Sequence, residues 1–422
     1  MHPPRDVLRE WCVPNRFLRA SALGAALTAN ALRPATGANP LAIPSFFGAW
    51  LTSELAPQNL AVTVAGSAAF VGARRRLTMS DRLALGLNAA SAAGLAVMIR
   101  QGMQAGGVVE DALAEGLGAD YLSRLDAPPT KSDLATPWKT VLKPWDIKEP
   151  RVRRTADVDY VGDGKFRHKL DIYSPRAGGE NLPVVIQVHG GAWILSQKNQ
   201  QGIPLMNHLA SRDFVCVAPN YPLSPKAKWP EHLVALKRAV AWTRANIAEY
   251  GGDPSFITVT GGSAGGHLAA MLGLTANEPG LQPGFEDADT SLQACVPFYG
   301  VYDIANTLGT RAGKQRLDWF LKSAMFGGRD VERYNSATAL LHVRPDAPPF
   351  FVIHGAHDSL VPVAEARELV RRLREVNKEP VVYAELPGTQ HGFDVFHSVR
   401  GAHVIRGVER FLRWVHAGHL QR

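Results

Sequence analysis

The stretch Ser255-Phe256-Ile257-Thr258-Val259-Thr260 runs directly into Gly261-Gly262-Ser263-Ala264-Gly265. A short β-branched strand, a glycine-flanked serine and a following run of helix formers give the strand–turn–helix order of a nucleophile elbow. The glycines allow a turn that is too tight for Cβ atoms. The serine hydroxyl would lie at a helix N-terminus, where the dipole favours developing negative charge. The stretch therefore predicts a nucleophilic Ser263 at the edge of a sheet.

The pentapeptide is weak evidence by itself, because 39 of the 422 residues are glycine. A dinucleotide-binding loop would need the spacing G-x-G-x-x-G, which Gly261 to Gly266 does not give. A phosphate-binding P-loop would need a Gly-Lys-Ser/Thr sequence, and no lysine follows these glycines. The serine hypothesis therefore depends on finding its catalytic partners.

Composition excludes several other function classes. The net charge of +8 is modest for 422 residues, and the basic residues are scattered apart from Arg74-Arg75-Arg76, so no nucleic-acid surface is expected. The three cysteines, Cys12, Cys216 and Cys295, are far apart and make no metal-binding spacing with histidine. We therefore expect no metal and no cofactor, and a small-molecule substrate. The sequence does not indicate an oligomeric state.

Strands and helices alternate from about residue 152 to the C-terminus, which predicts a doubly wound, mainly parallel sheet. Helices are expected at 233–247, 363–376 and 404–415. The expected strands are apolar or β-branched runs at 157–161, 169–173, 183–188, 214–219, 257–260, 294–299, 349–353 and 381–386.

The first 107 residues have a different character. No charged residue occurs in the 19 residues from Leu55 to Ala73 or the 17 from Leu83 to Ile99, and a basic loop separates the two stretches. One hypothesis is a helical hairpin in or on a membrane, with its basic loop facing the cytoplasm by the positive-inside rule. The other is a helical appendage packed on a cytoplasmic enzyme. A secretory signal at 20–31 is disfavoured because Asp6 and Glu10 precede it.

Three regions are therefore expected along the chain. Residues 1–107 form a helical region, which the first of the two hypotheses associates with a membrane. Residues 108–150 comprise an amphipathic helix (108–124) and a Pro-containing linker. Residues 151–422 form the catalytic α/β domain.

A serine nucleophile needs a base and a carboxylate that orients the base. In this fold class they follow the serine in the order Asp or Glu, then His. Asp358 lies just after the predicted strand 349–353, and His391 lies between Gln390 and Gly392 after the last strand. We expect Asp358 to orient His391, a partly exposed and mobile base.

Other titratable residues lie beside these two. His354 and His357 are expected to brace their loop instead of acting as the base. Asp394 is the second choice for the carboxylate, because it follows His391 too closely to orient it easily.

Oxyanion donors are expected after the strand 183–188, where His189-Gly190-Gly191-Ala192-Trp193 follows. Glycines let backbone N–H groups turn inward. We predict donors at Gly190, Gly191 and Ala192, together with the N–H of Ala264 next to the nucleophile. His189 is expected to brace this loop.

These motifs, with Tyr221-Pro222-Leu223-Ser224-Pro225, resemble the hormone-sensitive-lipase-like carboxylesterases of the α/β-hydrolase superfamily. The resemblance covers roughly residues 150 to 420. It implies an esterase or lipase in which Ser263 forms an acyl-enzyme, His391 moves the proton and Asp358 orients His391. The fold it implies is an α/β-hydrolase sheet.

Three positions depart from that pattern: Ala192 replaces a third glycine, Gly262 stands where Asp is frequent, and Pro222 replaces Arg. They point toward feruloyl-esterase-like and aryl-formamidase-like branches and leave the substrate open. An amidase or formamidase is therefore one alternative, and a non-catalytic, membrane-tethered binding protein is another. The insertion 307–333, with Trp319, is expected to be either a cover of the site or a surface helix.

Overall fold

The computed structural model describes residues 16–36, 39, 41–125 and 128–421. Its catalytic part is built on one eight-stranded sheet of order β1-β2-β4-β3-β5-β6-β7-β8. The first two strands pair antiparallel and β2 is antiparallel to β4, whereas all other pairs are parallel. The strands are β1 (Val152–Asp159), β2 (Lys169–Pro175), β3 (Leu182–Val188), β4 (Val215–Pro219), β5 (Gly252–Gly262), β6 (Ala294–Phe298), β7 (Phe350–Gly355) and β8 (Val381–Leu386).

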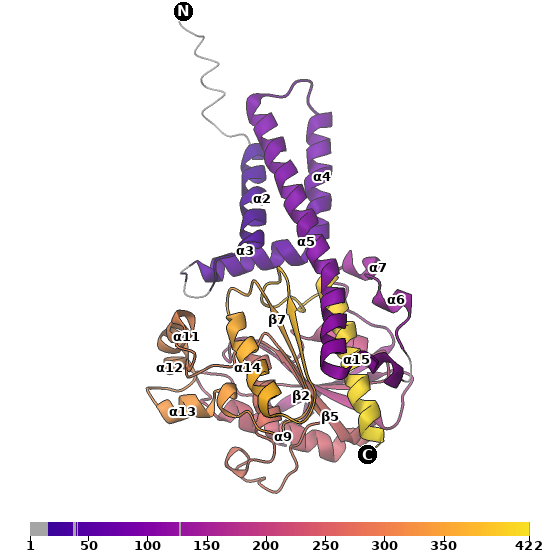
Figure 1. Ribbon diagram of the computed structural model, residues 1–422, viewed down its shortest axis with the longest axis vertical. Coiled ribbons are helices and arrows are strands. Elements are labelled where there is room, and N and C mark those ends of the chain that lie inside the picture. The colour runs from indigo at the N-terminus through magenta and orange to yellow at the C-terminus, as the bar shows by residue number, and fades with distance from the viewer. Residues whose placement is uncertain (1–15, 37–38, 40, 126–127, 422) are drawn as a thin grey trace, which may run out of the picture.

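Helices cover both faces of the sheet, which confirms the predicted doubly wound architecture (Figure 1). Each expected strand is present, and the central strands are buried on both faces, as their unbroken apolar runs predict. One face packs against α9 (Glu231–Asn246), α10 (Ala264–Leu274) and α14 (Val363–Val376). The other packs against the lower part of α5 (Met79–Leu117), α8 (Ile203–Ala210) and α15 (Val399–Leu420).

The N-terminal region projects from the catalytic part as a bundle of α2 (Arg16–Leu32), α4 (Ala56–Gly72) and the upper part of α5 (Figure 1). The expected hairpin is present. The expected boundary at residue 107, however, falls inside α5, which continues without a break to Leu117 and packs on β8 and α15. The expected helix 108–124 is thus the end of α5 followed by a 3-10 turn at Tyr121–Arg124.

The projecting bundle carries a band without charges, made of residues 20–32, 55–73 and 83–99. Much of this band is solvent-accessible: of the 17 residues of α4, Ala56 is the one that is buried. Within the described residues, α5 is long and apolar enough to cross a membrane, and 28% of its most apolar stretch is buried. That low burial distinguishes it from the core helix of a globular domain.

Polar and small residues hold the bundle together from inside. Asn88 of α5 donates to Ser67 of α4 at 2.9 Å, and Phe17 stacks on Phe70 with ring centroids 3.7 Å apart. A Cβ at Gly94 would lie 2.5 Å from the Thr28 methyl, so glycine allows α2 and α5 to approach closely. Such contacts are typical of helices that pack without a hydrophobic driving force.

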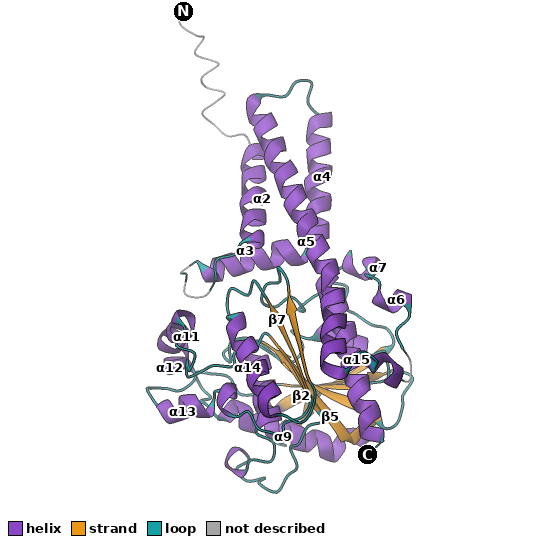
Figure 2. Ribbon diagram, in the orientation of Figure 1, coloured by secondary structure: helices purple, strands orange, loops and turns teal. Residues whose placement is uncertain are grey.

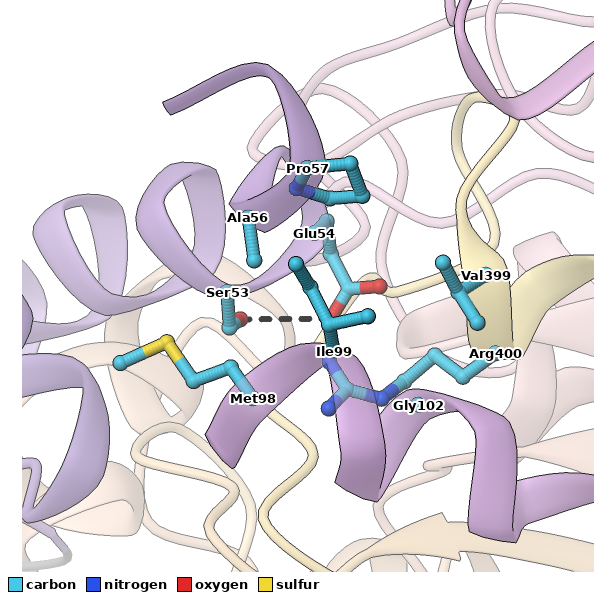
Figure 3. Close-up of a pocket in the computed structure, with 9 residues that line it drawn as sticks. All are labelled: Ser53, Glu54, Ala56, Pro57, Met98, Ile99, Gly102, Val399 and Arg400. Carbon is cyan, nitrogen blue, oxygen red and sulfur yellow. Dashed lines mark hydrogen bonds and ion pairs between the residues drawn. The ribbon is translucent and has the colours of Figure 1, made fainter. Parts of the chain in front are cut away.

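A short helix, α3 (Ala42–Glu54), crosses the base of the bundle, between it and the sheet (Figure 2). Its last residue, Glu54, forms an ion pair with Arg400 of α15, and both side chains are at least 98% buried. A cavity of about 10 Å³ lies beside this pair, lined also by Ser53, Met98 and other residues (Figure 3). Its volume suits one water molecule and excludes a substrate.

The buried pair predicts a specific pattern of stabilities. Replacing Arg400 by leucine leaves the Glu54 carboxylate buried without its partner, so Arg400→Leu should lower the unfolding free energy by about 3–5 kcal/mol. The double variant Glu54→Leu/Arg400→Leu removes both charges and should recover most of that loss. Denaturant unfolding of the full chain measures both. A double variant no more stable than Arg400→Leu would contradict this origin of the loss.

Candidate active site

Ser263 lies at the turn between β5 and α10, as the pentapeptide predicts. Its backbone has φ 61° and ψ −122°, a conformation that costs energy for any residue with a Cβ. The turn is held by the Ser263 N–H, which donates to the Phe298 carbonyl at 3.1 Å. A Cβ at Gly261 would lie 2.6 Å from the Gly265 oxygen, so this glycine is a steric requirement. The result is a serine fixed at the N-terminus of a buried helix.

Tyr299 explains why glycine stands before the nucleophile. A Cβ at Gly262 would lie 2.6 Å from the Tyr299 hydroxyl oxygen and 2.9 Å from its Cζ. The same tyrosine ring lies against His391, with ring centroids 4.5 Å apart. Tyr299 therefore touches both the elbow and the histidine loop, and it occupies the space that an aspartate at position 262 would need.

Asp358 and His391 are brought together from separate loops after β7 and β8. His391 Nδ1 donates to Asp358 Oδ2 at 2.7 Å. The other carboxylate oxygen accepts the N–H groups of Leu360 and Val361, each at 2.8 Å. His354 Nε2 lies 3.2 Å from Asp358 Oδ2 and 3.1 Å from the Val361 carbonyl, so this histidine braces the loop, as expected.

The environment keeps Asp358 ionised. Burial alone would raise its pKa, but the electrostatic attraction of the His391 ring and the hydrogen bonds from His354 and His391 hold the pKa well below its ordinary value. A permanent carboxylate at this position fixes the tautomer of His391 with its proton on Nδ1. The lone pair on Nε2 is then left to accept a proton.

Gln390 ties the two loops together. Its Oε1 accepts the N–H groups of Ser359 at 2.7 Å and His391 at 2.9 Å, and its Nε2 donates to the Ser359 hydroxyl at 2.8 Å. Nothing in the sequence around Gln390 indicated this role. It sets the spacing between the carboxylate loop and the histidine loop.

The expectation that His391 is partly exposed is wrong: the residue is 5% exposed. The reason is α3, whose Phe46 lies edge-on to the imidazole with centroids 6.0 Å apart. Trp50 of the same helix donates from Nε1 to the Gly392 carbonyl at 2.8 Å. Neither residue gave a signal in the sequence, because more than 300 positions separate α3 from the loop it covers.

The loop after β3 has an unusual backbone. Gly191, Ala192 and Trp193 all have positive φ, of 104°, 51° and 62°. In the described part of the chain, no acceptor is bonded to the N–H groups of Gly191 and Ala192. The Gly190 N–H, in contrast, donates to Gln201 Oε1 at 2.7 Å. The Gly190 N–H is therefore already used within the protein, unlike the predicted role as a donor to an oxyanion. A Cβ at Gly190 would lie 3.2 Å from that of Ser263.

His189 and His267 support this loop in their neutral forms. His189 stacks on Tyr221, whose hydroxyl donates to the His189 carbonyl at 2.9 Å. His267 Nε2 donates to the Ala337 carbonyl at 2.7 Å, and its Nδ1 accepts from Trp193 Nε1 at 3.3 Å. Burial lowers the pKa of each to about 4.

The remaining candidates have structural contacts. Asp394 accepts the Tyr299 hydroxyl, and burial raises the pKa of Asp394, so it does not orient His391. In the insertion, Leu321 and Met325 belong to the main core, whereas Trp319 is 87% exposed. Among the described residues the Ser263 hydroxyl has no hydrogen-bond partner, and such bonds are frequently long before substrate binds.

Comparison with known proteins shows to which family the chain belongs. The chain is 42% identical over 417 residues to LipM, a probable carboxylic ester hydrolase of Mycobacterium tuberculosis, and the match covers 95% of this chain and 93% of LipM. The chain belongs to the LipM esterase family of α/β-hydrolases. It is also 41% identical to the esterase LipQ of the same organism, over 72% of this chain and 73% of LipQ. A family model described as BD-FAE matches residues 170–373.

Solved structures support the fold. Esterase B from Lactobacillus rhamnosis has a TM-score of 0.55 at 19% identity, covering 65% of this chain and 89% of that chain. A carbohydrate esterase from gut microbiota has a TM-score of 0.52 at 24% identity, covering 61% of this chain and 96% of that chain. The LipM relationship goes further, since its coverage includes most of the N-terminal helices. The protein is therefore an ester-hydrolysing enzyme, and the amidase and non-catalytic alternatives gain no support.

The contact between Gly262 and Tyr299 predicts strong coupling. Gly262→Ala should lower stability by about 1–3 kcal/mol, as overpacking does elsewhere, because the new methyl group meets the tyrosine ring. In a Tyr299→Ala background the same substitution should cost much less. A double-mutant cycle based on thermal unfolding measures the coupling. Additive effects of the two substitutions would contradict the steric explanation.

The neutral His267 predicts a loss of stability in acid. Between pH 6.5 and 4 the unfolded chain binds a proton at this residue and the folded chain does not, so stability falls as pH falls. At pH 5 the loss relative to pH 7 should be about 2 kcal/mol from this residue. Unfolding free energies at the two pH values test it, with His267→Gln as the comparison. An unchanged pH slope in that variant would argue against a neutral His267.

Proposed function

We propose that Ser263 is the nucleophile of this esterase, with His391 as its base and Asp358 as the orienting carboxylate. This proposal rests on the hydrogen bond from His391 Nδ1 to a buried, ionised Asp358, which leaves Nε2 free as a base. His391 Nε2 takes the Ser263 proton while the oxygen attacks the ester carbonyl carbon. The C–O bond to the alcohol then breaks, and His391 returns the proton to the leaving alcohol. Water, activated in the same way, releases the acid from the acyl-enzyme.

The negative oxygen formed in each step needs donors near Ser263. The N–H groups of Gly191, Ala192 and Ala264 are the best candidates, because Gly190 already donates to Gln201. The positive φ angles of the loop support this assignment, since strained backbone frequently marks a functional turn. One such donor is typically worth about 3 kcal/mol in the transition state.

The triad predicts large losses of activity. Ser263→Ala should lower kcat for p-nitrophenyl butyrate by about 10⁶-fold and Asp358→Asn by about 10⁴-fold. Ser255→Ala, a change at an exposed serine near the start of β5, should leave the rate unchanged. A fluorophosphonate probe followed by peptide mapping should label Ser263. Labelling at another residue, or normal turnover by Ser263→Ala, would refute the assignment.

The second part of the proposal is that the bundle of α2, α4 and α5 sits in a membrane. The charge-free band is bounded along α5 by Arg82 and Arg100, about 27 Å apart at 1.5 Å per residue. The hydrocarbon core of a bilayer is about 30 Å thick. Six arginines (Arg16, Arg19, Arg74, Arg75, Arg76 and Arg82) lie at the far end, which the positive-inside rule places in the cytoplasm. The catalytic domain would then lie on the other side of the membrane.

A lysine in the middle of α4 tests membrane attachment. Val64 is 55% exposed, so Val64→Lys costs little in water but about 3 kcal/mol at the centre of a bilayer. The wild-type chain should remain in the membrane fraction after alkaline carbonate extraction, and Val64→Lys should be extracted to a larger extent. Val331→Lys, on the catalytic domain, is the matched control. Release of the wild-type chain into the soluble fraction would overturn the proposal.

A further inference from the structure

The helix α3 has two apolar faces with different neighbours. Its inner face carries Phe46 and Trp50, which contact the loop of His391. Its outer face carries Ile43, Phe47 and Leu51, spaced four residues apart, with exposures of 63%, 53% and 40%. A stripe of large apolar side chains on a helix that already packs on its opposite side indicates a second apolar environment.

The position of α3 suggests what that environment is. The helix runs across the bundle at its base, where the charge-free band ends (Figures 1 and 2). Arg33 follows α2 and Arg100 lies in α5, and both are exposed, so charges mark the same end of the band. A helix without charged residues before Glu54 that lies across three membrane helices is placed as an interfacial helix would be.

A second exposed surface lies at the base of the bundle. Trp138, Leu142 and Trp145 are 41%, 58% and 64% exposed, and the exposed Lys139 and Lys143 stand between them. This segment includes α7 (Trp138–Val141), and Gln58 at the base of α4 donates to the Val141 carbonyl at 2.7 Å. Tryptophan alternating with lysine is typical of segments at the surface of an anionic membrane.

We infer that α3 and the surface around α7 rest in the interface of an anionic bilayer, and that the substrate is a lipid ester dissolved in it. This inference rests on the function proposed above for Ser263. The ester would pass beside α3, since the same helix meets the membrane on one face and the catalytic histidine loop on the other. Phe46 and Trp50 give that route an apolar wall, which suits acyl chains.

The geometry also explains why the cover over His391 is tethered so firmly. Glu54 holds the end of α3 to Arg400, nine residues after His391. Trp50 holds its middle to Gly392 itself. Because α3 is fixed at these two points, it keeps water from His391 while its outer apolar face stays in lipid. Soluble esters need no such contact with α3's outer face.

The experiment compares two substrates of the full chain in anionic vesicles of phosphatidylcholine and phosphatidylglycerol. One is dioleoylglycerol dissolved in the vesicles, and the other is soluble p-nitrophenyl butyrate. Ile43→Asp and Phe47→Asp should each lower release of oleate by about tenfold and change butyrate hydrolysis by less than about twofold. Val331→Asp, 67% exposed on the catalytic domain, should change neither rate.

Each other outcome would count against the inference. Equal losses with both substrates would mean that the outer face acts only through folding. Unchanged oleate release in both variants would mean that the stripe does not meet lipid and serves something else, such as a protein partner. A wild-type enzyme that hydrolyses p-nitrophenyl butyrate but not dioleoylglycerol would overturn the proposed substrate class. Failure of both substrates, together with no fluorophosphonate labelling of Ser263, would instead refute the proposed triad.

Discussion

The site depends on a close approach of three strand ends that leaves no room for side chains. A Cβ at Gly266 would lie 2.5 Å from the Phe298 carbonyl, and one at Gly190 would lie 2.5 Å from the Gly262 carbonyl. Because the loops after β3, β5 and β6 meet here backbone to backbone, the Ser263 side chain lies directly beside Gly190 of the loop after β3. The strained φ of Ser263 persists because these contacts over-determine it.

The sequence predicted the sheet and the pairing of Asp358 with His391 for a physical reason. Parallel strands are buried on both faces, so they appear as apolar runs, and functional loops follow their carboxyl ends. Asp358 and His391 each follow such a run, and the structure brings them to 2.7 Å. Gly190 shows the limit of prediction from local sequence patterns. Its N–H is taken by Gln201, a side chain whose approach no local pattern could indicate.

The N-terminal region was harder to predict, because its defining contacts are long-range. The apolar runs indicated helices, but not that α5 would continue from the bundle to the sheet. The cover of His391 by Phe46 and Trp50 depends on tertiary packing across most of the chain. The exposure of an imidazole cannot be judged from its sequence neighbours when a distant helix packs on it.

These long-range contacts make the N-terminal region part of the enzyme and not an independent anchor. One continuous helix, α5, belongs to both the charge-free band and the layer that covers β8. The buried Glu54–Arg400 pair then fixes α3 relative to α15, and Trp50 fixes it relative to the histidine loop. A displacement of the bundle must therefore strain the contacts around His391. Since interiors are close-packed and transmit such strain, whatever surrounds the bundle also constrains the geometry around His391.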